Sequence, residues 1–410
     1  MAKAKKTAFF CQNCGYESAK WMGQCPACRE WNTFVEEPTA AKTPAGTQGI
    51  GNHSAAGRKP VHLTEISTGK EERIPTGIGE LDRVLGGGIV PGSLTLVGGD
   101  PGIGKSTLLL QVCRMLSTAG HQVLYISGEE SLRQIKLRAV RIGEFNENLS
   151  LLCETNLDII RAVMEKEKPE IAVIDSIQTM YTSDIESAPG SVSQVRTCGN
   201  ELMRIGKMHG IPVFIVAHVT KSGDLAGPRI VEHMVDCVLS FTGDRSHEMR
   251  ILRAQKNRFG TTSEIGAFEM AQQGLMEIEN LSGTLLEEME KDSEGAVVTA
   301  VYEGTRPLVL EVQALTSQAN IGFARRTALG VDNSRLSMIL AVLEKKMGLS
   351  LINQDVYVNI VGGIRPEGTY TDLAVALAVY SSYRGKALGS STLAFGEIGL
   401  TGDLRAVQNG

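Results

Sequence analysis

From residue 73 onwards, short apolar runs alternate with helix-like stretches, the pattern of a parallel β-sheet with helical crossovers. Two of the runs, "IAVI" at 171–174 and "IPVFIVA" at 211–217, are continuously apolar, as expected for buried strands. A new section follows the charged stretch "EEMEKDSEG" at 287–295. The pattern predicts an α/β domain over residues 61–280 and a separate domain over residues 281–410.

The first 60 residues lack this alternation of apolar runs and helix-like stretches. Residues 36–60 lack aliphatic periodicity and are rich in Ala, Gly, Pro and Thr, which predicts a flexible linker. Residues 1–35 contain two Cys-x2-Cys pairs separated by ten residues: Cys11 with Cys14, and Cys25 with Cys28. Four thiolates complete the tetrahedral shell that Zn²⁺ prefers, and such a closed shell is structural rather than catalytic.

We therefore predict a four-Cys zinc ribbon over residues 1–35, folded largely by its metal because the segment is too short for an apolar core. Trp21 and Trp31 either cover the two metal-binding turns or stack on bases or on a partner.

Composition excludes several classes of protein. The chain has 410 residues, enough for two or three domains, and its 42% hydrophobic and 21% charged residues are ordinary for a globular protein. The net charge of −5 means that any contact with nucleic acid must use local basic patches. No apolar run is long enough for a membrane span, and no secretory leader is recognisable, so we expect a cytoplasmic protein without membrane contact.

The other cysteines also fit a reducing compartment. They are scattered singly in apolar surroundings, and we expect four buried thiols: Cys113, Cys153, Cys198 and Cys237.

A glycine-rich loop between a strand and a helix carries the clearest chemistry. Gly99-x4-Gly104-Lys105-Ser106 has the phosphate-loop spacing, in which backbone N–H groups and a helix N-terminus surround phosphate oxygens. Lys105 is expected to reach the β- and γ-phosphates, and Ser106 to ligate Mg²⁺. The predicted nucleotide-binding residues are Gly99, Asp100, Pro101, Gly102, Ile103, Gly104, Lys105, Ser106 and Thr107.

Carboxylates at two strand ends supply further candidates. Asp175 ends a buried strand, where it either holds the Mg²⁺ hydration shell or caps a helix; the nearby phosphate loop favours the metal role. Glu129 and Glu130 end another strand, and repulsion between adjacent carboxylates raises a pKa towards that of a useful base. We expect Glu129 to be the catalytic carboxylate, with Glu130 as the alternative; a solvated helix start is the simpler explanation.

His218 follows the strand at 211–217, so it is either a sensor of the γ-phosphate or a structural histidine.

These motifs resemble the RecA/KaiC/DnaB class of ATPases. With the four-Cys ribbon and the motif "KNRFG" at 256–260, nearly the whole chain resembles the bacterial RadA (Sms) family of DNA repair and recombination ATPases. The resemblance implies a RecA-like core, with ATP as substrate and Zn²⁺ and Mg²⁺ as cofactors. It also implies a homo-oligomeric ring, expected to be a hexamer, with ATP between neighbours, and branch migration of single-stranded and branched DNA alongside the RecA recombinase.

Further residue roles follow from the same resemblance. Lys221, Arg229 and Arg196 are expected to contact DNA phosphates. Lys256 and Arg258 are expected to reach the γ-phosphate of a neighbouring subunit, where they act in catalysis; direct DNA contact and a solvated turn are the alternatives.

The C-terminal third resembles the proteolytic domain of Lon, which implies an α+β fold. Lon places its nucleophilic serine in a PxDGPSAG-like turn, whereas the corresponding turn here, residues 366–372, contains no serine. We therefore expect a scaffold without peptidase activity, and from the final "GDLRAVQNG" a truncated domain. An ATP-dependent Lon-like protease and a nucleotide-gated DNA-binding scaffold remain as alternative functions. Eight basic residues either form a DNA-binding surface on this domain or are ordinary solvated charges: Arg325, Arg326, Arg335, Lys345, Lys346, Arg365, Arg384 and Lys386.

Overall fold

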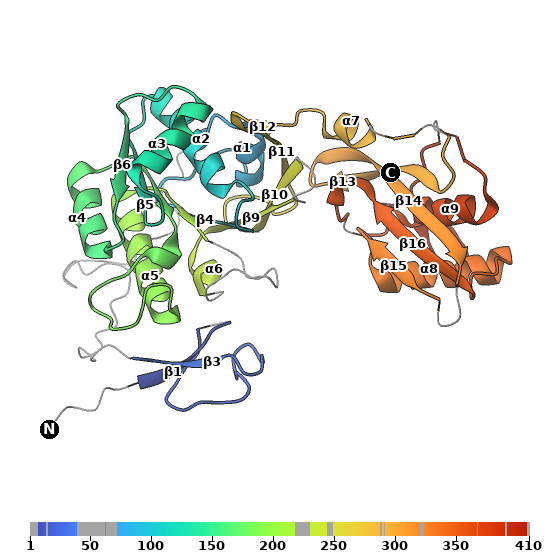
Figure 1. Ribbon diagram of the computed structural model, residues 1–410, viewed down its shortest axis with the longest axis horizontal. Helices are drawn as coiled ribbons and strands as arrows, with labels where there is room; N and C mark the ends of the chain where they lie inside the picture. Colours follow the sequence, from blue (N-terminus) through green and yellow to red (C-terminus); the bar gives the residue numbers. More distant parts are fainter. Residues whose placement is uncertain are drawn as a thin grey trace. The chain divides into compact units, whose positions relative to one another are not determined.

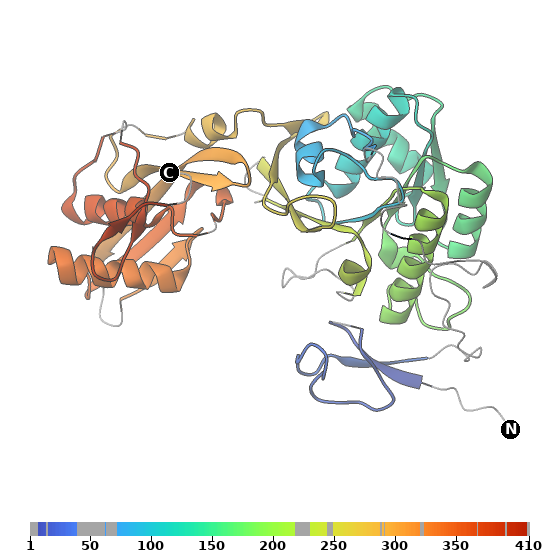
Figure 2. The same ribbon diagram turned by 180° about the vertical axis from the view of Figure 1, so that it is seen from behind.

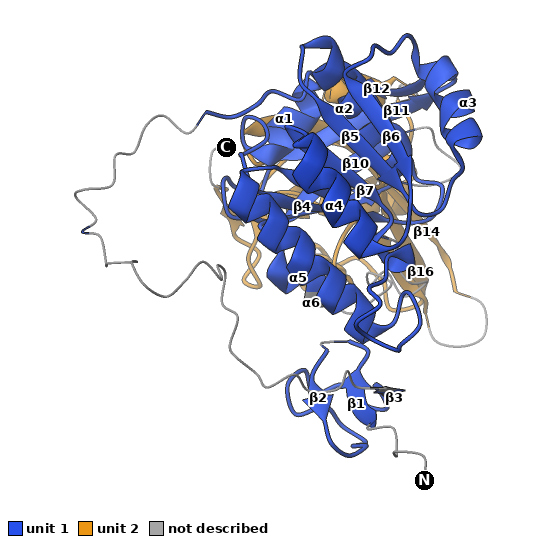
Figure 3. Cartoon of the chain, turned by 90° about the vertical axis from the view of Figure 1, so that its left-hand side faces the viewer, with its two compact units in different colours: residues 1–277 blue, residues 278–410 orange. Residues whose placement is uncertain are grey.

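The computed structural model divides into two compact units, residues 1–277 and residues 278–410 (Figure 3). The residues that it describes are 7–13, 15–38, 62, 72–217, 230–243, 249–287, 289–290, 292–319, 324–366, 368–389 and 392–407. Within this part of the chain, no helix is long and apolar enough to cross a membrane.

The first unit begins with a small antiparallel sheet, in the order β2-β1-β3. Its strands are β1 (Thr7–Cys11), β2 (Glu17–Ser18) and β3 (Phe34–Pro38). Strand β3 extends to Pro38 because it pairs with β1 along its whole length, so the predicted linker at 36–60 starts inside a strand. The rest of that linker lies outside the described residues.

A nine-stranded sheet forms the centre of the first unit, in the order β12-β11-β10-β9-β4-β8-β7-β5-β6 (Figure 1). The six strands from β9 to β6 are parallel, and β10, β11 and β12 extend the sheet in antiparallel fashion. The strands are β4 (Leu94–Gly99), β5 (Val123–Ser127), β6 (Leu149–Cys153), β7 (Ile171–Asp175), β8 (Val213–Val216), β9 (Cys237–Thr242), β10 (Met249–Asn257), β11 (Ile265–Ala271) and β12 (Gly274–Glu277).

Helices cover both faces of this sheet (Figure 2), which explains the continuously apolar strands. In β7, Ile171 and Val173 belong to the core shared with α2, whereas Ala172 and Ile174 belong to the core shared with α4 and α5. The helices are α1 (Gly79–Leu85), α2 (Lys105–Thr118), α3 (Leu132–Ile142), α4 (Leu157–Glu167), α5 (Val192–His209) and α6 (Ile230–Met234), with a 3₁₀ turn η2 (Ile177–Thr179).

The second unit is an α+β domain. Its four-stranded mixed sheet has the order β13-β14-β16-β15, and only β15 and β16 run parallel. The elements are α7 (Leu281–Leu286), β13 (Ala296–Glu303), β14 (Arg306–Gln318), β15 (Arg326–Leu329), α8 (Asn333–Met347), β16 (Gln354–Ile360), η3 (Val361–Gly363), α9 (Asp372–Arg384), β17 (Glu397–Ile398) and β18 (Leu404–Arg405). Leu336, Ile339, Leu340 and Leu343 of α8 are buried at helical spacing, so this unit has an apolar core of its own.

Candidate nucleotide site and its supporting residues

The phosphate loop connects β4 to α2, and its glycines are needed for different reasons. Gly99 and Gly104 have φ angles of 150° and 119°, and a Cβ atom would lie 2.6 Å from the Phe241 carbonyl oxygen or 2.7 Å from Met270 Cε. A Cβ atom at Gly102, where φ is 81°, would meet nothing within 4 Å. The loop is therefore packed closely on its inner side and open at Gly102, as a phosphate cradle requires.

Lys105 lies at the start of α2 and is only 4% exposed. Its Nζ donates to the carbonyl oxygens of Gly99 at 2.7 Å and Asp100 at 3.0 Å. Burial lowers the pKa of Lys105, while the charges of Asp175, Asp100 and Glu129 oppose that shift. The predicted lysine and carboxylates thus meet at one end of the sheet, where an added phosphate would neutralise the buried ammonium.

Asp175 is the last residue of β7 and is buried. Its Oδ2 accepts a 2.5 Å hydrogen bond from the Tyr125 hydroxyl on the neighbouring strand β5. Burial and the charge of Asp175 raise the pKa of Tyr125 well above its usual value, so the phenol stays a donor. Asp175 is therefore oriented, and with the half-buried Ser106 in the first turn of α2 it offers the oxygen donors that Mg²⁺ prefers.

Adjacent carboxylates after β5 have different partners. Glu129 is exposed, and its carboxylate accepts a hydrogen bond from the hydroxyl of Ser176, the residue after Asp175. Glu130 is half-buried and forms an ion pair with Arg138 of α3. Glu129 thus points towards Asp175, whereas Glu130 is held against α3 by its ion pair with Arg138.

Three supporting residues were missed by sequence reasoning: Tyr125, Ser176 and Arg138. Ser176 directly follows the predicted magnesium ligand, which was a usable signal. Tyr125 and Arg138 have no local signal, because each meets its carboxylate only through the fold.

The cysteine cluster in the N-terminal sheet suits a metal. The Sγ atoms of Cys11, Cys25 and Cys28 all lie within 4.8 Å of one another, and Cys14 lies outside the described residues. The two metal-binding turns share one backbone pattern, since the carbonyl oxygens of Cys11 and Cys25 accept from the N–H groups four residues later, both at 2.8 Å. Three convergent thiols fit the sulfur-rich shell that Zn²⁺ prefers.

The remaining cysteines correct one expectation. Burial raises the pKa of the Cys198 and Cys237 thiols to about 12, and Cys113 is fully buried as well. The expectation of a buried thiol is wrong for Cys153, which is exposed at the end of β6, where its Sγ lies 3.3 Å from the Glu130 carbonyl oxygen. The end of an edge strand has no neighbour to cover it.

The KNRFG segment is more ordered than a solvated turn. Strand β10 includes the first two residues of the segment, because Lys256 and Asn257 pair with β9. Asn257 Nδ2 donates to the carbonyl oxygens of Val84 and Leu85 at 3.2 Å, at the end of α1, and its Oδ1 accepts from the Phe259 N–H at 2.9 Å. Asn257 therefore holds the turn against α1.

The two cations of this segment have different partners. Lys256 Nζ donates to the carbonyl oxygens of Glu232 at 2.8 Å, His233 at 3.1 Å and Val235 at 2.7 Å, at the C-terminal end of α6. Arg258 Nη1 donates to Asp236 Oδ1 at 3.0 Å, and the Arg258 side chain is 57% exposed.

Lys256 and Arg258 lie at the opposite end of the sheet from the phosphate loop of the same chain. Asn257 pairs with Cys237, which pairs with Thr95 near the start of β4, whereas the phosphate loop follows Gly99 at its other end. A strand rises about 3.3 Å per residue, so roughly 15 Å along β4 separates the level of Asn257 from the phosphate loop.

Of the predicted DNA-binding residues, only Arg196 is described. It is exposed on α5 and makes no ion pair within the described part of the chain. His218, Lys221 and Arg229 lie outside the described residues, so their predicted roles stay predictions.

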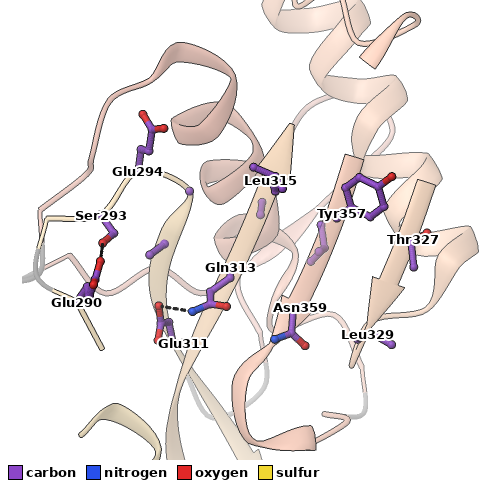
Figure 4. Close-up of a pocket in the computed structure, with 14 residues that line it drawn as sticks. Glu290, Ser293, Glu294, Glu311, Gln313, Leu315, Thr327, Leu329, Tyr357 and Asn359 are labelled. Atoms are coloured by element: carbon purple, nitrogen blue, oxygen red, sulfur yellow. Dashed lines mark hydrogen bonds between the residues drawn. The ribbon is translucent and has the colours of Figure 1, made fainter. Parts of the chain in front are cut away.

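A cavity of about 430 Å³ opens on the second unit beside its four-stranded sheet (Figure 4). Three carboxylates line it, from Glu290, Glu294 and Glu311, and the described lining residues include no Lys or Arg. Glu311 accepts a 3.1 Å hydrogen bond from Gln313. A negatively lined cavity repels phosphate, so it is unsuited to nucleotide or DNA.

The last residue of the Lon-like turn, Asp372, makes hydrogen bonds that hold parts of the second unit together. Asp372, at the start of α9, is buried and accepts from Arg335 Nε at 3.0 Å and from the Ile398 N–H at 3.1 Å. The hydrogen bond to Asp372 raises the pKa of Arg335, and this ion pair removes Arg335 from the expected basic surface. Ser381 and Ser382 of α9 accept from the backbone N–H groups of Gly295 and Thr316, both at 2.9 Å. None of these described side chains forms a nucleophile–base pair.

Comparisons with known proteins agree with this arrangement. Family models match residues 9–36 (rubredoxin metal binding domain), residues 63–224 (AAA domain) and residues 321–409 (subunit ChlI of Mg-chelatase). The chain is 53% identical over 408 residues to the DNA repair protein RadA of Bacillus subtilis (strain 168), covering 99% of this chain and 89% of that protein. It is 50% identical over 407 residues to the DNA repair protein RadA of Streptococcus pyogenes serotype M1, with the same coverage.

Among solved structures, a KaiC-like protein of Pyrococcus horikoshii OT3 aligns with 19% identity and a TM-score of 0.43, covering 50% of this chain and 99% of that chain.

Proposed function

The chain belongs to the RadA family of DNA repair proteins, and we propose that it is a DNA-stimulated ATPase that drives branch migration of recombination intermediates. In this proposal it works as a homo-oligomeric ring, a hexamer, on single-stranded and branched DNA together with the RecA recombinase. The proposal starts from the ATPase domain and from membership of a DNA repair family. It adds the motor activity, the DNA structures, the ring and the partnership with RecA.

The observation that carries the proposal is the position of the KNRFG cations. They lie at the end of β4 that is remote from the chain's own phosphate loop, roughly 15 Å away along the strand. Arg258 therefore cannot complete its own nucleotide site without a large rearrangement. A head-to-tail interface brings one such end against the phosphate-loop end of the next subunit, and repeated interfaces of this kind close into rings.

The chain's own residues divide the work at the nucleotide. Lys105 exchanges its two loop carbonyls for phosphate oxygens, and the open side of the loop at Gly102 admits them. Ser106 and Asp175 hold Mg²⁺, with Tyr125 keeping Asp175 in place. Bound Mg²⁺ neutralises charge on the phosphates. Glu129 orients or deprotonates the attacking water, and Arg258 from the neighbour stabilises the charge that develops on the γ-phosphate.

DNA contact is assigned to the backbone phosphates. Arg196 is exposed and free of ion pairs within the described residues, and Lys221 and Arg229 are assigned to the same surface. Contacts of this kind carry no sequence information and weaken as salt rises. The proposal therefore includes DNA binding that is insensitive to sequence and sensitive to salt.

ATP hydrolysis with and without single-stranded DNA tests the proposal. We expect stimulation by DNA, and a loss of at least about 100-fold in Lys105→Ala because the phosphate-binding cation is removed. Arg258→Ala subunits mixed with Lys105→Ala subunits should recover part of the activity, because an Arg258→Ala phosphate loop meets an intact Arg258 wherever the contributing neighbour is a Lys105→Ala subunit.

Two results would contradict the proposal. Hydrolysis that is equal with and without DNA removes the DNA-dependent motor. Absence of single-turnover hydrolysis in the purified protein favours a nucleotide-gated scaffold, in which ATP only holds the subunits together.

A further inference from the structure

One buried carboxylate joins three elements at the start of β4. Asp236 lies between α6 and β9, and its side chain is 3% exposed. Its Oδ1 accepts from Arg258 Nη1 at 3.0 Å. Its Oδ2 accepts from Lys207 Nζ, near the end of α5, at 2.7 Å and from the Leu94 N–H at 3.1 Å. Asp236 therefore ties the KNRFG segment to a rigid helix and to the central strand.

Among the residues that the structure describes, the Arg258 side chain is anchored by Asp236 alone. A guanidinium carries five N–H donors, and the contact with Asp236 occupies one nitrogen, Nη1. The side chain remains 57% exposed. A group held in this way has a defined direction and still has donors for an incoming anion, which is the arrangement that preorganised charge stabilisation needs.

The positive charges around Asp236 explain why its carboxylate is needed to hold Arg258 in place. Lys207 and Arg258 both contact the carboxylate, and Lys256 lies close enough for Asp236 to favour its charged form. Glu232 also lies close enough to Lys256 to favour its charged form, so two carboxylates offset the three cations. Without the Asp236 carboxylate, Lys207 and Arg258 lose the charge that holds them together, and the more exposed Arg258 turns into solvent.

We propose that Asp236 is a positioning residue that holds the Arg258 guanidinium ready for the triphosphate bound to a neighbouring subunit. The inference rests on the proposed function, because it assumes that Arg258 acts across an interface. It adds a residue that touches neither substrate nor cofactor and acts through Arg258. Asp236 is adjacent to none of the motifs from which the nucleotide site was predicted.

The full-length, zinc-loaded Asp236→Asn variant tests the inference. Asparagine keeps an acceptor for the Leu94 N–H and loses the charge that orients Arg258. In the presence of single-stranded DNA we expect kcat to fall about tenfold to 100-fold, with KM for ATP changed less than about threefold. The matched control is Lys207→Met, which removes the second cation in contact with Asp236 and leaves the Arg258 contact. Its kcat should stay within about threefold of the value for the unchanged protein.

Mixed oligomers separate positioning from a structural effect. Loss of the Leu94 contact would disturb β4 and the phosphate loop of the same subunit, and that defect cannot be rescued by a neighbour. Positioning of Arg258 predicts that Asp236→Asn subunits recover hydrolysis when mixed with Lys105→Ala subunits, which supply an intact Arg258. No recovery, or an equal loss in Lys207→Met, would overturn the inference.

The same assay distinguishes the inference from the proposed function. If the mixture of Arg258→Ala and Lys105→Ala fails to recover, the interface role of Arg258 itself is wrong. If that mixture recovers and the Asp236→Asn mixture does not, only the role of Asp236 is wrong. Should Asp236→Asn not fold, Asp236→Glu takes its place. It keeps the charge but displaces it by one methylene group, so Arg258 is held in a different direction, and the same loss of kcat and the same recovery in mixed oligomers are expected.

Discussion

Two adjacent glutamates have different surroundings in the structure. Glu129 and Glu130 are interchangeable by sequence pattern, yet their contacts differ, because Glu130 forms an ion pair with Arg138 of α3. Glu129 contacts the Ser176 hydroxyl beside Asp175 and adds to the charge around Lys105. The ion pair with Arg138 occupies Oε1 of Glu130 and fixes the direction of its carboxylate, so Glu129 is the better candidate for the base.

We therefore predict different effects for two matched substitutions. Glu129→Gln should lower kcat about 100-fold or more with little change in KM for ATP, because it removes the base and keeps the size. Glu130→Gln should keep kcat within about tenfold and lower the free energy of unfolding by about 1–3 kcal/mol, because Arg138 loses its partner. Steady-state ATPase kinetics and urea unfolding measure the two effects; a larger kcat loss in Glu130→Gln would reverse the assignment.

At the scale of elements, α6 shows why Lys256 and Arg258 are not equivalent. A helix of five residues cannot be stable alone. Lys256 donates to three carbonyl oxygens at its C-terminal end, and an ammonium has only three donors. Lys256 is thus fully occupied as a helix cap in this structure, whereas the Arg258 side chain has Asp236 as its one partner among the described residues. To contact a neighbour's phosphate, Lys256 must first leave α6.

Capping by Lys256 predicts a local loss of stability. Lys256→Met should leave the last carbonyl groups of α6 without donors. It should also speed amide hydrogen exchange at Val235, whose N–H donates to the Val231 carbonyl oxygen at 3.1 Å, by about tenfold, equivalent to about 1.4 kcal/mol. Arg258→Met, two residues away and largely exposed, is the matched control and should leave this exchange nearly unchanged. Equal exchange in the two variants would show that Lys256 does not stabilise α6.

At the scale of the whole molecule, its parts have different sources of stability. The nine-stranded sheet has an apolar core on each face, and the second unit has its own core. The N-terminal sheet has two small clusters: Cys11, Cys25 and Phe34 with partly buried neighbours, and Ala8 and Phe10 with Val192 of α5. Such a segment depends on its metal, whereas the two larger cores do not.

Metal removal should therefore unfold one part of the chain. Both tryptophans, Trp21 and Trp31, lie in the N-terminal sheet region, so tryptophan fluorescence reports on that region alone. A strong zinc chelator should change the emission, and Cys25→Ser should reproduce the change without chelator. Thermal unfolding followed by far-UV circular dichroism should keep its main transition. Unchanged emission after complete zinc removal would contradict a metal-dependent fold.

Short-range patterns were sufficient for much of this protein. The phosphate loop, the cysteine pairs and the buried parallel strands depend on residues a few positions apart, since turn geometry, metal-ligand spacing and strand periodicity are local. That is why the amino-acid sequence alone predicts the RecA-like core, the zinc ribbon and the main nucleotide-binding residues, together with the family resemblance.

The contacts that set the function of individual side chains span longer distances. Tyr125 and Asp175 are 50 residues apart, Lys207 and Asp236 are 29 apart, and Arg258 and Asp236 are 22 apart. Their meeting depends on the order of strands in the sheet and on which helix covers which face. No local pattern encodes that order, because it results from burying all the apolar faces at once. The tertiary structure therefore decided which partners distinguish Glu129 from Glu130 and Arg258 from Lys256.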